Sequence, residues 1–180
     1  ETGSDNRGGK RMKDIHGKNQ ASLDPLRSAQ YDWDENILRR TLDDLVASDA
    51  VLYLSHPFGD MIGPEEFYQQ ALAVLKMAWP DVERRDWIVM AGEDEHGASW
   101  VGCGGHYVGT FIAPLLDIPP TGHLVHMRYH DFYRFEDGKV VEYQALWDLP
   151  EVMIQAGAWP MAPSLGPVSY THLTLPTICS

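Results

Sequence analysis

The sequence has little that would suit a nucleic acid, a membrane or a metal cluster. Only 14 lysines and arginines stand against 26 acidic residues, and the net charge is −12. This balance argues against a nucleic-acid backbone or an anionic membrane as partner, because both attract basic surfaces. There is no run of about 18 apolar residues and no signal-peptide pattern, so we expect a soluble, cytoplasmic protein. Two cysteines, Cys103 and Cys179, are too few for a metal site or a disulfide framework.

What the sequence does have is an ordinary globular composition. Apolar residues make up 44% of the chain and charged residues 22%, which is typical of a soluble domain. A length of 180 residues suffices for one domain with a substantial core and is short for two. We therefore predict a single domain over residues 31–166.

Both ends of the chain look foreign to this domain. Residues 1–20 combine five basic and three acidic residues with hardly any apolar ones. That is a disordered composition, and we expect residues 1–30 to be disordered or weakly ordered. Residues 167–180, PVSYTHLTLPTICS, read back through eleven residues into codons like those of a transposon end and sequencing adapter. We interpret them as a non-native tail, which removes His172 and Cys179 from any functional argument and leaves open a longer natural protein.

Hydrophobic periodicity predicts helices in the first half of the body. Apolar residues recur at helical spacing after Asp34, a suitable N-cap: Ile37, Leu38, Leu42, Leu45 and Val46. A short strand within DAVLYLSHPFGDMIG ends in a turn at Pro57–Gly59. Pro64 and the two acids after it predict a second helix start. That helix should end at Pro80 and bury one side, made of Phe67, Leu72, Leu75 and Met77.

The second half reads as long strands. Residues 86–93, 99–113, 123–135 and 139–148 are rich in β-branched and aromatic side chains, with glycine or proline between them. Asp-Gly at the junction of the last two predicts a tight hairpin, because such turns require positive φ angles. Helix, strand, helix and then a run of antiparallel strands predicts an α+β fold, with helices covering one face of a curved sheet.

Asp148 stands where the last strand ends and a short apolar helix begins. It can be a helix N-cap, because aspartate accepts hydrogen bonds from the free amides of the first turn. It can also be a proton-transfer group at the rim of an apolar pocket. A regular strand places alternate residues on one face, here Glu142, Gln144, Leu146 and Asp148, and turns Tyr143 and Trp147 to the other. The residues alone leave both interpretations open.

Several histidines lie on the predicted strands. His106 shares a face with Trp100 on a glycine-rich strand, where it can polarise a carbonyl group or be a hydrogen-bonded core histidine. His126 and His130 are roughly 13 Å apart on a regular strand and cannot bind one ion. We interpret these two and Arg128 as a polar outer face or dimer interface, and we predict no metal.

Four motifs in this order resemble the NTF2-like superfamily and, more narrowly, its SnoaL-like polyketide cyclases and ester cyclases. They are HPFGDMIGPEEF, IPPTGHLV, FYRFEDGKVVEY and WDLPEVMIQAG, the last echoing a D-x-x-x-hydrophobic-hydrophobic-x-Q-x-G pattern. The likeness covers about Tyr31 to Trp159. It implies a cone-shaped α+β fold in which a curved antiparallel sheet wraps on N-terminal helices and encloses a pocket.

In this family the aspartate at the end of the last long strand acts as the acid/base of an intramolecular aldol closure, and no metal or organic cofactor is used. The matching position here is Asp148, so the resemblance implies a cofactor-independent cyclase or isomerase of an apolar, carbonyl-bearing small molecule. We predict Asp148 and His106 as catalytic residues. The predicted substrate-binding residues are His56 at the pocket mouth, Trp100, Tyr129, Gln144 and Trp147. Family members commonly form homodimers through the exposed sheet face, and we expect the same here.

Two other interpretations stay open. The chain can be a non-catalytic ligand-binding or dimerisation module, which can be half of a longer duplicated protein. It can also be an epoxide hydrolase, because limonene-type epoxide hydrolases share the fold and the aspartate at this position. Those enzymes add an Arg-x-Asp pair on the strand that here reads SWVGCGGHYVG, where the pair is missing. No G-x-S-x-G or Cys-His nucleophile arrangement is evident, so we do not expect covalent hydrolysis.

Overall fold

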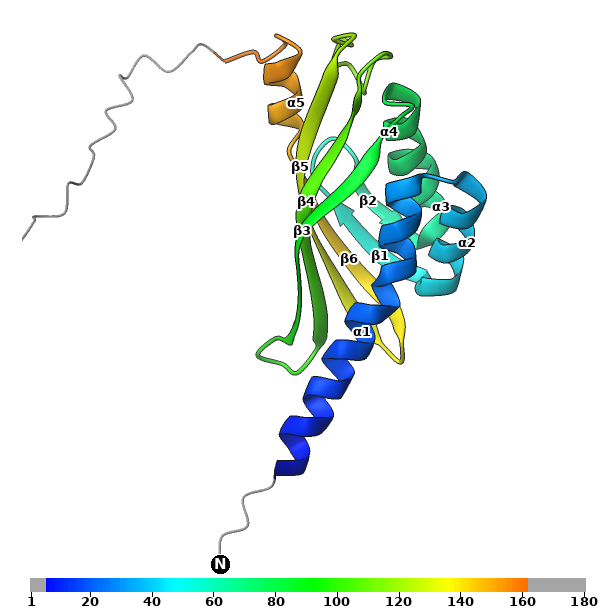
Figure 1. Cartoon of the computed structure of the whole chain (residues 1–180), viewed down its shortest axis with the longest axis vertical. Helices are drawn as coiled ribbons and strands as arrows, with labels where there is room; N and C mark the ends of the chain where they lie inside the picture. The colour runs from blue at the N-terminus through cyan, green and yellow to red at the C-terminus, as the bar shows by residue number, and fades with distance from the viewer. Residues whose placement is uncertain (1–5, 162–180) are drawn as a thin grey trace, which may run out of the picture.

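A curved six-stranded sheet carries the first five helical segments of the chain on one face (Figure 1). The structure is a computed structural model that describes residues 6–161, with side chains from residue 15 onward, and the predicted tail 167–180 lies outside these residues. In chain order the elements are α1 (Asn6–Asp32), α2 (Glu35–Leu45), β1 (Val46–Leu54), β2 (Gly59–Ile62), α3 (Gly63–Phe67), the π-helix η1 (Tyr68–Leu72), α4 (Ala73–Ala78), β3 (Glu83–Glu93), β4 (Ser99–Thr110), β5 (Leu124–Glu136), β6 (Lys139–Trp147) and α5 (Leu149–Gln155). The predicted α+β fold is confirmed.

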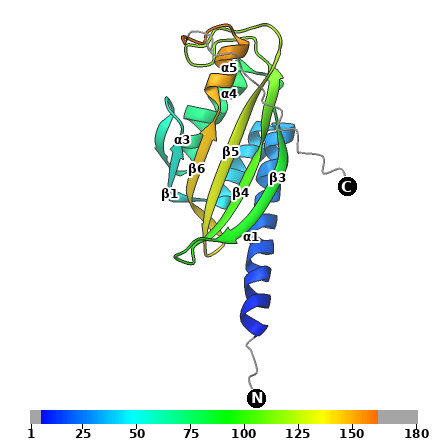
Figure 2. The ribbon, with the colours of Figure 1, turned by 90° about the vertical axis from the view of Figure 1, so that its left-hand side faces the viewer.

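The strand order in the sheet is β2-β1-β6-β5-β4-β3, and every neighbouring pair is antiparallel except β1 with β6. Figure 2 looks onto the sheet face that points away from α1–α4, which we call the outer face. Along β5, alternate residues are buried and exposed, so the inner and outer faces can be assigned residue by residue. The Asp137–Gly138 turn joins β5 to β6 with positive φ angles at both residues, as the hairpin prediction required.

Beyond the end of β6, α5 lies along the edge of β5. β6 pairs with β5 only as far as the Tyr129–Trp147 pair, whereas β5 continues back to Leu124. Side chains of α5 form hydrogen bonds with the backbone groups of β5 that β6 leaves unpaired. Gln155 accepts a hydrogen bond from the His126 amide at 3.1 Å and donates one to its carbonyl at 2.7 Å. Glu151 accepts one from the Arg128 amide at 2.7 Å, so the backbone of β5 stays paired beyond the end of β6.

For residues 6–30, the part of the segment 1–30 that the structure describes, α1 corrects the expectation of a disordered or weakly ordered segment. It is a continuous helix from its first described residue to Asp32 and lies beside the sheet (Figure 1). Leu23, Leu26 and Ala29 recur every three residues on one face and are buried. The prediction was wrong because it applied the polar composition of residues 1–20 to residues 21–30 as well, where this apolar stripe lies. Such a stripe can pack against a partner, which a disordered segment lacks.

The other predicted helices are largely confirmed. Asp34 caps α2 by accepting a hydrogen bond from the Ile37 amide at 3.0 Å. The second predicted helix consists of α3, η1 and α4 in succession, and of its predicted buried side chains Phe67, Leu72 and Leu75 are buried. Met77 is 72% exposed, so that part of the prediction is wrong. Residues two positions apart point to opposite sides of a helix, and Leu75 occupies the buried side.

The core lies between the inner sheet face and α1–α4 and is rich in large aromatic side chains. Fully buried ones include Trp79, Tyr107, Phe111, Tyr129, Tyr143 and Trp147. Among the helices described, none combines the length and hydrophobicity that crossing a membrane requires. The interior of the cone is thus filled chiefly by side chains, and open space lies along its seams.

Candidate functional site

The structure does not gather the predicted substrate-binding residues into one place. Trp100 and Gln144 lie on the outer face, and the Trp100 indole donates to Asp94 at 3.0 Å. Tyr129 and Trp147 point inward and are buried, each packing against the Tyr107 ring with centroids 4.9 and 5.3 Å away. His56 is an exposed residue of the turn between β1 and β2.

Asp148 has the capping geometry that one of the two interpretations required. Its Oδ1 accepts a hydrogen bond from the Glu151 amide at 3.1 Å at the start of α5. Its own amide donates to the Arg128 carbonyl, and Arg128 is the register partner of His106. Asp148 and His106 therefore flank β5 from two sides, with backbones roughly 10 Å apart. Asp148 lines none of the three grooves described below, and its catalytic role stays a prediction.

A buried ionic cluster occupies the inner face instead. Arg84 on β3 is fully buried and binds two carboxylates: Asp131 on β5 at 2.7 Å and Asp86 on its own strand at 3.0 Å. Arg27 of α1 binds the other oxygen of Asp86 at 2.6 Å, and the Tyr129 hydroxyl donates to Asp86 as well. One arginine thus bridges two carboxylates on separate strands, and α1 contributes a second arginine.

The two carboxylates of this cluster differ in proton affinity. Burial raises the pKa of Asp131, and the Arg84 guanidinium offsets that rise only in part. Burial also acts to raise the pKa of Asp86, but the charge of Arg84 and the hydrogen bonds from Tyr129 and Arg27 hold it below its usual value. Two neighbouring carboxyl groups with pKa values moved in opposite directions are the arrangement that acid/base sites use.

Asp86 is the member of the pair that reaches an open groove. Its side chain is 12% exposed, whereas that of Asp131 is fully buried. The groove holds about 570 Å³ along the seam between α1 and β3 and is lined by Asp24, Arg27, Ser28, Tyr31, Arg84, Arg85 and Asp86. On Asp86, Oδ1 takes two hydrogen bonds and Oδ2 only one, so Oδ2 keeps acceptor capacity.

Gly105 makes the cluster possible. A Cβ atom at this position would lie 2.5 Å from the Tyr129 hydroxyl and 2.1 Å from the backbone oxygen of Arg85. A glycine is therefore needed for Tyr129 to pass β4 and reach Asp86. The neighbouring glycines on the outer face do not leave open room, because the Phe132 and His130 rings lie over Gly102 and Gly104.

A second cluster lies on the outer face beside α5. The His106 ring packs against Trp87 and His126, with centroids 4.2 and 5.3 Å away. Glu151 approaches His126 to 3.3 Å, and Arg128 to 3.6 Å. Burial lowers the pKa of His106, and His126 and Arg128 lower it further against the opposing charge of Glu151. A neutral imidazole in this position can accept a proton or bind a cation.

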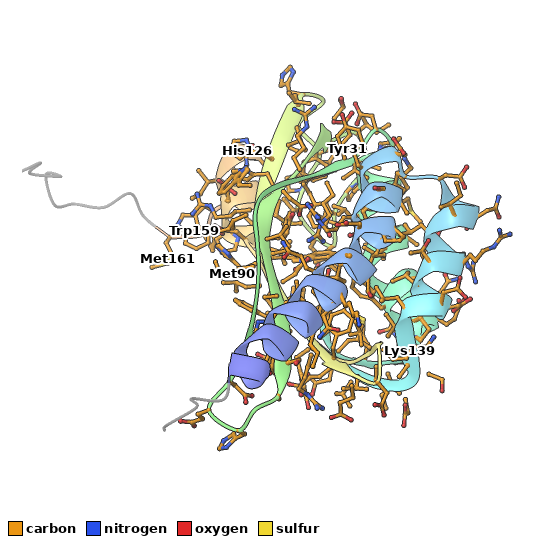
Figure 3. All side chains as sticks on the ribbon, turned by 60° about the horizontal axis from the view of Figure 1, so that its bottom comes forward. Tyr31, Met90, His126, Lys139, Trp159 and Met161 are labelled. Atoms are coloured by element: carbon orange, nitrogen blue, oxygen red, sulfur yellow. The ribbon has the colours of Figure 1, made fainter. Side chains whose placement is uncertain are left out.

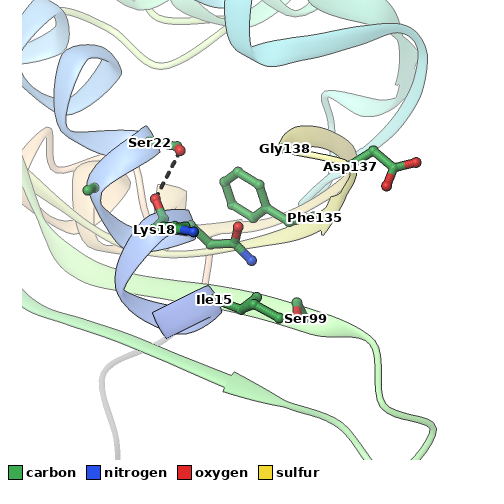
Figure 4. A pocket seen from close by; sticks show the side chains of 9 residues that line it. Ile15, Lys18, Ser22, Ser99, Phe135, Asp137 and Gly138 are labelled. Atoms are coloured by element: carbon green, nitrogen blue, oxygen red, sulfur yellow. Dashed lines mark hydrogen bonds between the residues drawn. The ribbon is translucent and has the colours of Figure 1, made fainter. Parts of the chain in front are cut away.

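Another groove, of about 710 Å³, lies between α1 and the β5–β6 hairpin (Figure 4). Ile15, Lys18 and Ser22 of α1 face Phe135 and Ser99 across it. Neither carboxylate of the inner cluster lines this groove, which offers surface for binding and no evident acid/base pair. A third groove of about 520 Å³ lies on the outer face and includes the predicted residue Gln144.

Sequence reasoning missed Arg84, Asp86 and Asp131, although the signals were present. Residues 83–86 read ERRD, an Arg-x-Asp pair that lies one strand earlier than the strand searched for it. Alternation along β5 also turns Asp131 inward, between two tyrosines. A carboxylate at an inward position of a central strand requires a partner, and only the fold shows that Arg84 supplies it.

A model of the SnoaL-like polyketide cyclase family matches residues 30–156. The chain belongs to this family. No curated protein sequence matches it. Burial raises the pKa of the Cys103 thiol to about 11, which disfavours it as a nucleophile in this SnoaL-like protein.

Solved structures similar to this chain support the NTF2-like fold. A candidate SnoaL-like polyketide cyclase from Jannaschia sp. CCS1 is 22% identical with a TM-score of 0.65, over 82% of this chain and 96% of that one. IdmH from Streptomyces antibioticus, a candidate polyketide cyclase, is 23% identical with a TM-score of 0.63, over 77% and 98%. AclR from Streptomyces galilaeus, a candidate hydroxylase, is 21% identical with a TM-score of 0.64, over 83% and 87%. At these identities the likeness establishes the fold alone.

Proposed function

We propose that this SnoaL-like protein is a cofactor-independent enzyme of the cyclase or isomerase type, acting by proton transfer on a small carbonyl-bearing molecule. The observation that carries the proposal is the carboxylate pair bridged by Arg84, with Asp86 open to a groove. Family membership supports the reaction class. The groove is more polar than the apolar pocket expected from the sequence, so the carbonyl end of the substrate would bind there.

In this proposal Asp86 acts as the general base. Its free Oδ2 lone pair takes a proton from the carbon next to the substrate carbonyl, and the electrons of the broken C–H bond move onto the carbonyl oxygen. Arg27 and Arg85 line the same groove and can stabilise that enolate oxygen. The enolate carbon then attacks a second carbonyl of the same molecule, whose oxygen takes the proton back from Asp86, or the enolate takes that proton back at another carbon. The lowered pKa of Asp86 keeps it ionised through the neutral range.

The sequence favoured a different catalytic pair, Asp148 with His106. A proton-exchange experiment distinguishes that pair from Asp86. Exchange of the methyl protons of 2-acetylnaphthalene in D₂O, followed by NMR, reports enolate formation without knowledge of the natural substrate. We expect Asp86→Asn to lower the enzymatic exchange rate by on the order of a hundredfold or more, and Asp148→Asn to leave it nearly unchanged. The melting temperature and ketone affinity of each variant show whether its fold and binding are intact.

The pH profile gives a second readout. A reaction that depends on neutral His106 should lose rate only at a pH below about 6.5, because burial lowers the pKa of the imidazole beneath its usual value. A reaction that depends on Asp86 should keep its rate down to about pH 4, since the pKa of Asp86 is lowered. Loss of exchange in Asp148→Asn but not in Asp86→Asn would move the site to Asp148, and the absence of any enzymatic exchange would favour a non-catalytic binding module.

A second candidate reaction is hydrolysis of a small epoxide. It is favoured by the Arg84-x-Asp86 pair and the bridge from Arg84 to Asp131, since limonene-type epoxide hydrolases, which share this fold, use an Arg-x-Asp pair and another aspartate. In that reaction a carboxylate takes one proton from water while the water oxygen bonds to a ring carbon. The C–O bond at that carbon breaks, and the departing oxygen takes a proton from a protonated carboxyl group. Incorporation of ¹⁸O from labelled water into the diol of cyclohexene oxide tests it, with Asp131→Asn expected to abolish the product.

We also propose that the protein forms a homodimer through the outer sheet face. Large apolar side chains are exposed there on four strands: Tyr53, Ile88, Met90, Phe132 and Leu146. Figure 3 shows Met90 and His126 on the side of the sheet away from α1. An exposed apolar sheet face of this kind is a typical association surface, and a twofold axis would place it against itself.

A further inference from the structure

We propose that His106, His126 and Glu151 form a binding site for a divalent transition-metal ion, of which Zn²⁺ is the best match. The three residues come from β4, β5 and α5, and one ligand atom from each lies within 4.8 Å of the others. The site lies on the outer face, apart from the Arg84 cluster, and does not rest on the proposed reaction. The sequence predicted no metal because it compared only histidines on one strand.

The spacing of the ligand atoms suits a zinc ion. Zinc binds histidine nitrogen at about 2.0–2.1 Å, so two tetrahedral ligands stand roughly 3.4 Å apart. Nε2 of His126 and Oε1 of Glu151 are 3.3 Å apart. The His106 and His126 rings are inclined by 86°, so their edges can converge instead of stacking. A small side-chain rotation of His106 would bring the third ligand within range.

The surrounding contacts hold these side chains in place. Nε2 of His106 is buried without a hydrogen-bond partner among the described residues, which is costly for a polar atom and would be relieved by an ion. Trp87 covers the His106 ring at 4.2 Å. Gln155 holds the His126 backbone through both its amide and its carbonyl. The Arg128 amide binds Oε2 of Glu151 and leaves Oε1 for the ion.

Arg128 is the natural competitor of the ion. Its guanidinium lies 3.6 Å from Oε1 of Glu151, the same oxygen that would bind the metal. The side chain is 48% exposed, so it can turn into solvent when an ion arrives. Removal of this positive charge should therefore strengthen metal binding. If Arg128 made only a surface contact and did not compete for Glu151, its removal would not strengthen binding.

The donor set decides the class of ion. Two imidazole nitrogens and one carboxylate oxygen suit zinc and its transition-metal neighbours, whereas calcium and magnesium prefer oxygen ligands alone. Three protein ligands leave a fourth position for water or another small ligand, as in catalytic zinc sites. The His126 side chain is 52% exposed, so that position would face solvent in the single chain.

Calorimetric titration of Zn²⁺ into the purified full chain tests the site, with His172→Ala and Cys179→Ser in every protein to remove tail ligands. We expect one ion per chain. Glu151→Gln, which keeps an oxygen for the Arg128 amide, and His126→Ala should each weaken binding by on the order of tenfold to a hundredfold. His130→Ala is the matched control on the same strand face and should leave the affinity unchanged. Arg128→Gln should bind Zn²⁺ more tightly than the parent.

Visible absorption of bound Co²⁺ provides a readout of coordination that is independent of activity. Melting temperatures of the metal-free variants show whether each remains folded, and Glu151→Gln carries the test if a histidine variant does not. The proposal is overturned if Zn²⁺ does not bind at a saturable single site. It is equally overturned if Glu151→Gln leaves the affinity unchanged, if His130→Ala weakens it as much, or if Arg128→Gln weakens it.

Discussion

Replacing Arg84 by methionine would leave Asp131 buried without its counter-ion. Both side chains are fully shielded from solvent, and the ion pair between them is 2.7 Å long. Removing one partner of such a buried pair costs about 3–5 kcal/mol, because the remaining charge loses both water and partner. For a domain of this size each kcal/mol lowers the melting temperature by about 2–4 °C, so we expect a fall of roughly 6–20 °C at pH 7.

The destabilisation should depend on pH in a defined direction. Burial raises the pKa of Asp131 and Arg84 lowers it, so the substitution leaves burial to raise the pKa further in the folded variant. A carboxyl group whose pKa is higher in the folded state than in the unfolded state binds its proton more tightly when folded. The cost of Arg84→Met should therefore grow as the pH rises above the raised pKa that Asp131 has in the parent protein, by at most about 1.4 kcal/mol per pH unit, and shrink towards acid.

Urea denaturation at several pH values measures this dependence. The double variant Arg84→Met with Asp131→Leu removes both charges and should recover much of the lost stability, whereas Asp131→Leu alone leaves Arg84 with Asp86 as its remaining carboxylate. Arg85→Met is the matched control, because Arg85 is the next residue on β3 and its ion pair with Glu83 is exposed. A pH-independent cost, or losses that simply add in the double variant, would refute the reasoning.

Two further predictions concern the ends of the chain and its association. Deletion of residues 1–14 should leave the melting temperature within a few degrees of that of the full chain. Deletion of residues 1–30 removes the buried side chains Leu23 and Leu26 and should lower the free energy of unfolding by more than about 3 kcal/mol. Equal effects of the two deletions in a thermal scan would contradict the packing of α1. Phe132→Glu on the outer face should convert a dimer to a monomer in sedimentation at concentrations on the order of tens of micromolar, and a wild-type protein that is monomeric there would remove the dimer proposal.

The fold could be predicted from local signals because they agreed with one another. Asp34, the proline and acids at the start of α3, and the Asp-Gly turn each identify an element boundary that the structure confirms. α1 was missed because Pro25 lies within it and its first half is polar, and both signals speak against a helix. Its apolar stripe stabilises a helix only by packing against the sheet, and the sequence does not show that contact.

The candidate site could be predicted only in part, because alternation gives the face of a strand but not the partners across it. The sequence correctly placed Gln144 and Trp147 on opposite faces. It could not show that Arg84 meets Asp131, since their 47-residue separation is closed only by the pairing of β3, β4 and β5. The same pairing brings His106 to His126, which no spacing along one strand reveals.

The motif WDLPEVMIQAG, one of the four that carried the family resemblance, has a structural role that explains its spacing. Asp148 starts α5, and Glu151 and Gln155, one helical turn apart, reach the amides of Arg128 and His126 on the strand edge that β6 leaves open. Residues four apart lie on one side of a helix, as residues two apart lie on one side of a strand, so the two elements match in register. The motif therefore specifies how α5 docks. Because docking uses one oxygen of Glu151, the other is left facing His126, and the same docking that completes the sheet also brings together the proposed metal ligands.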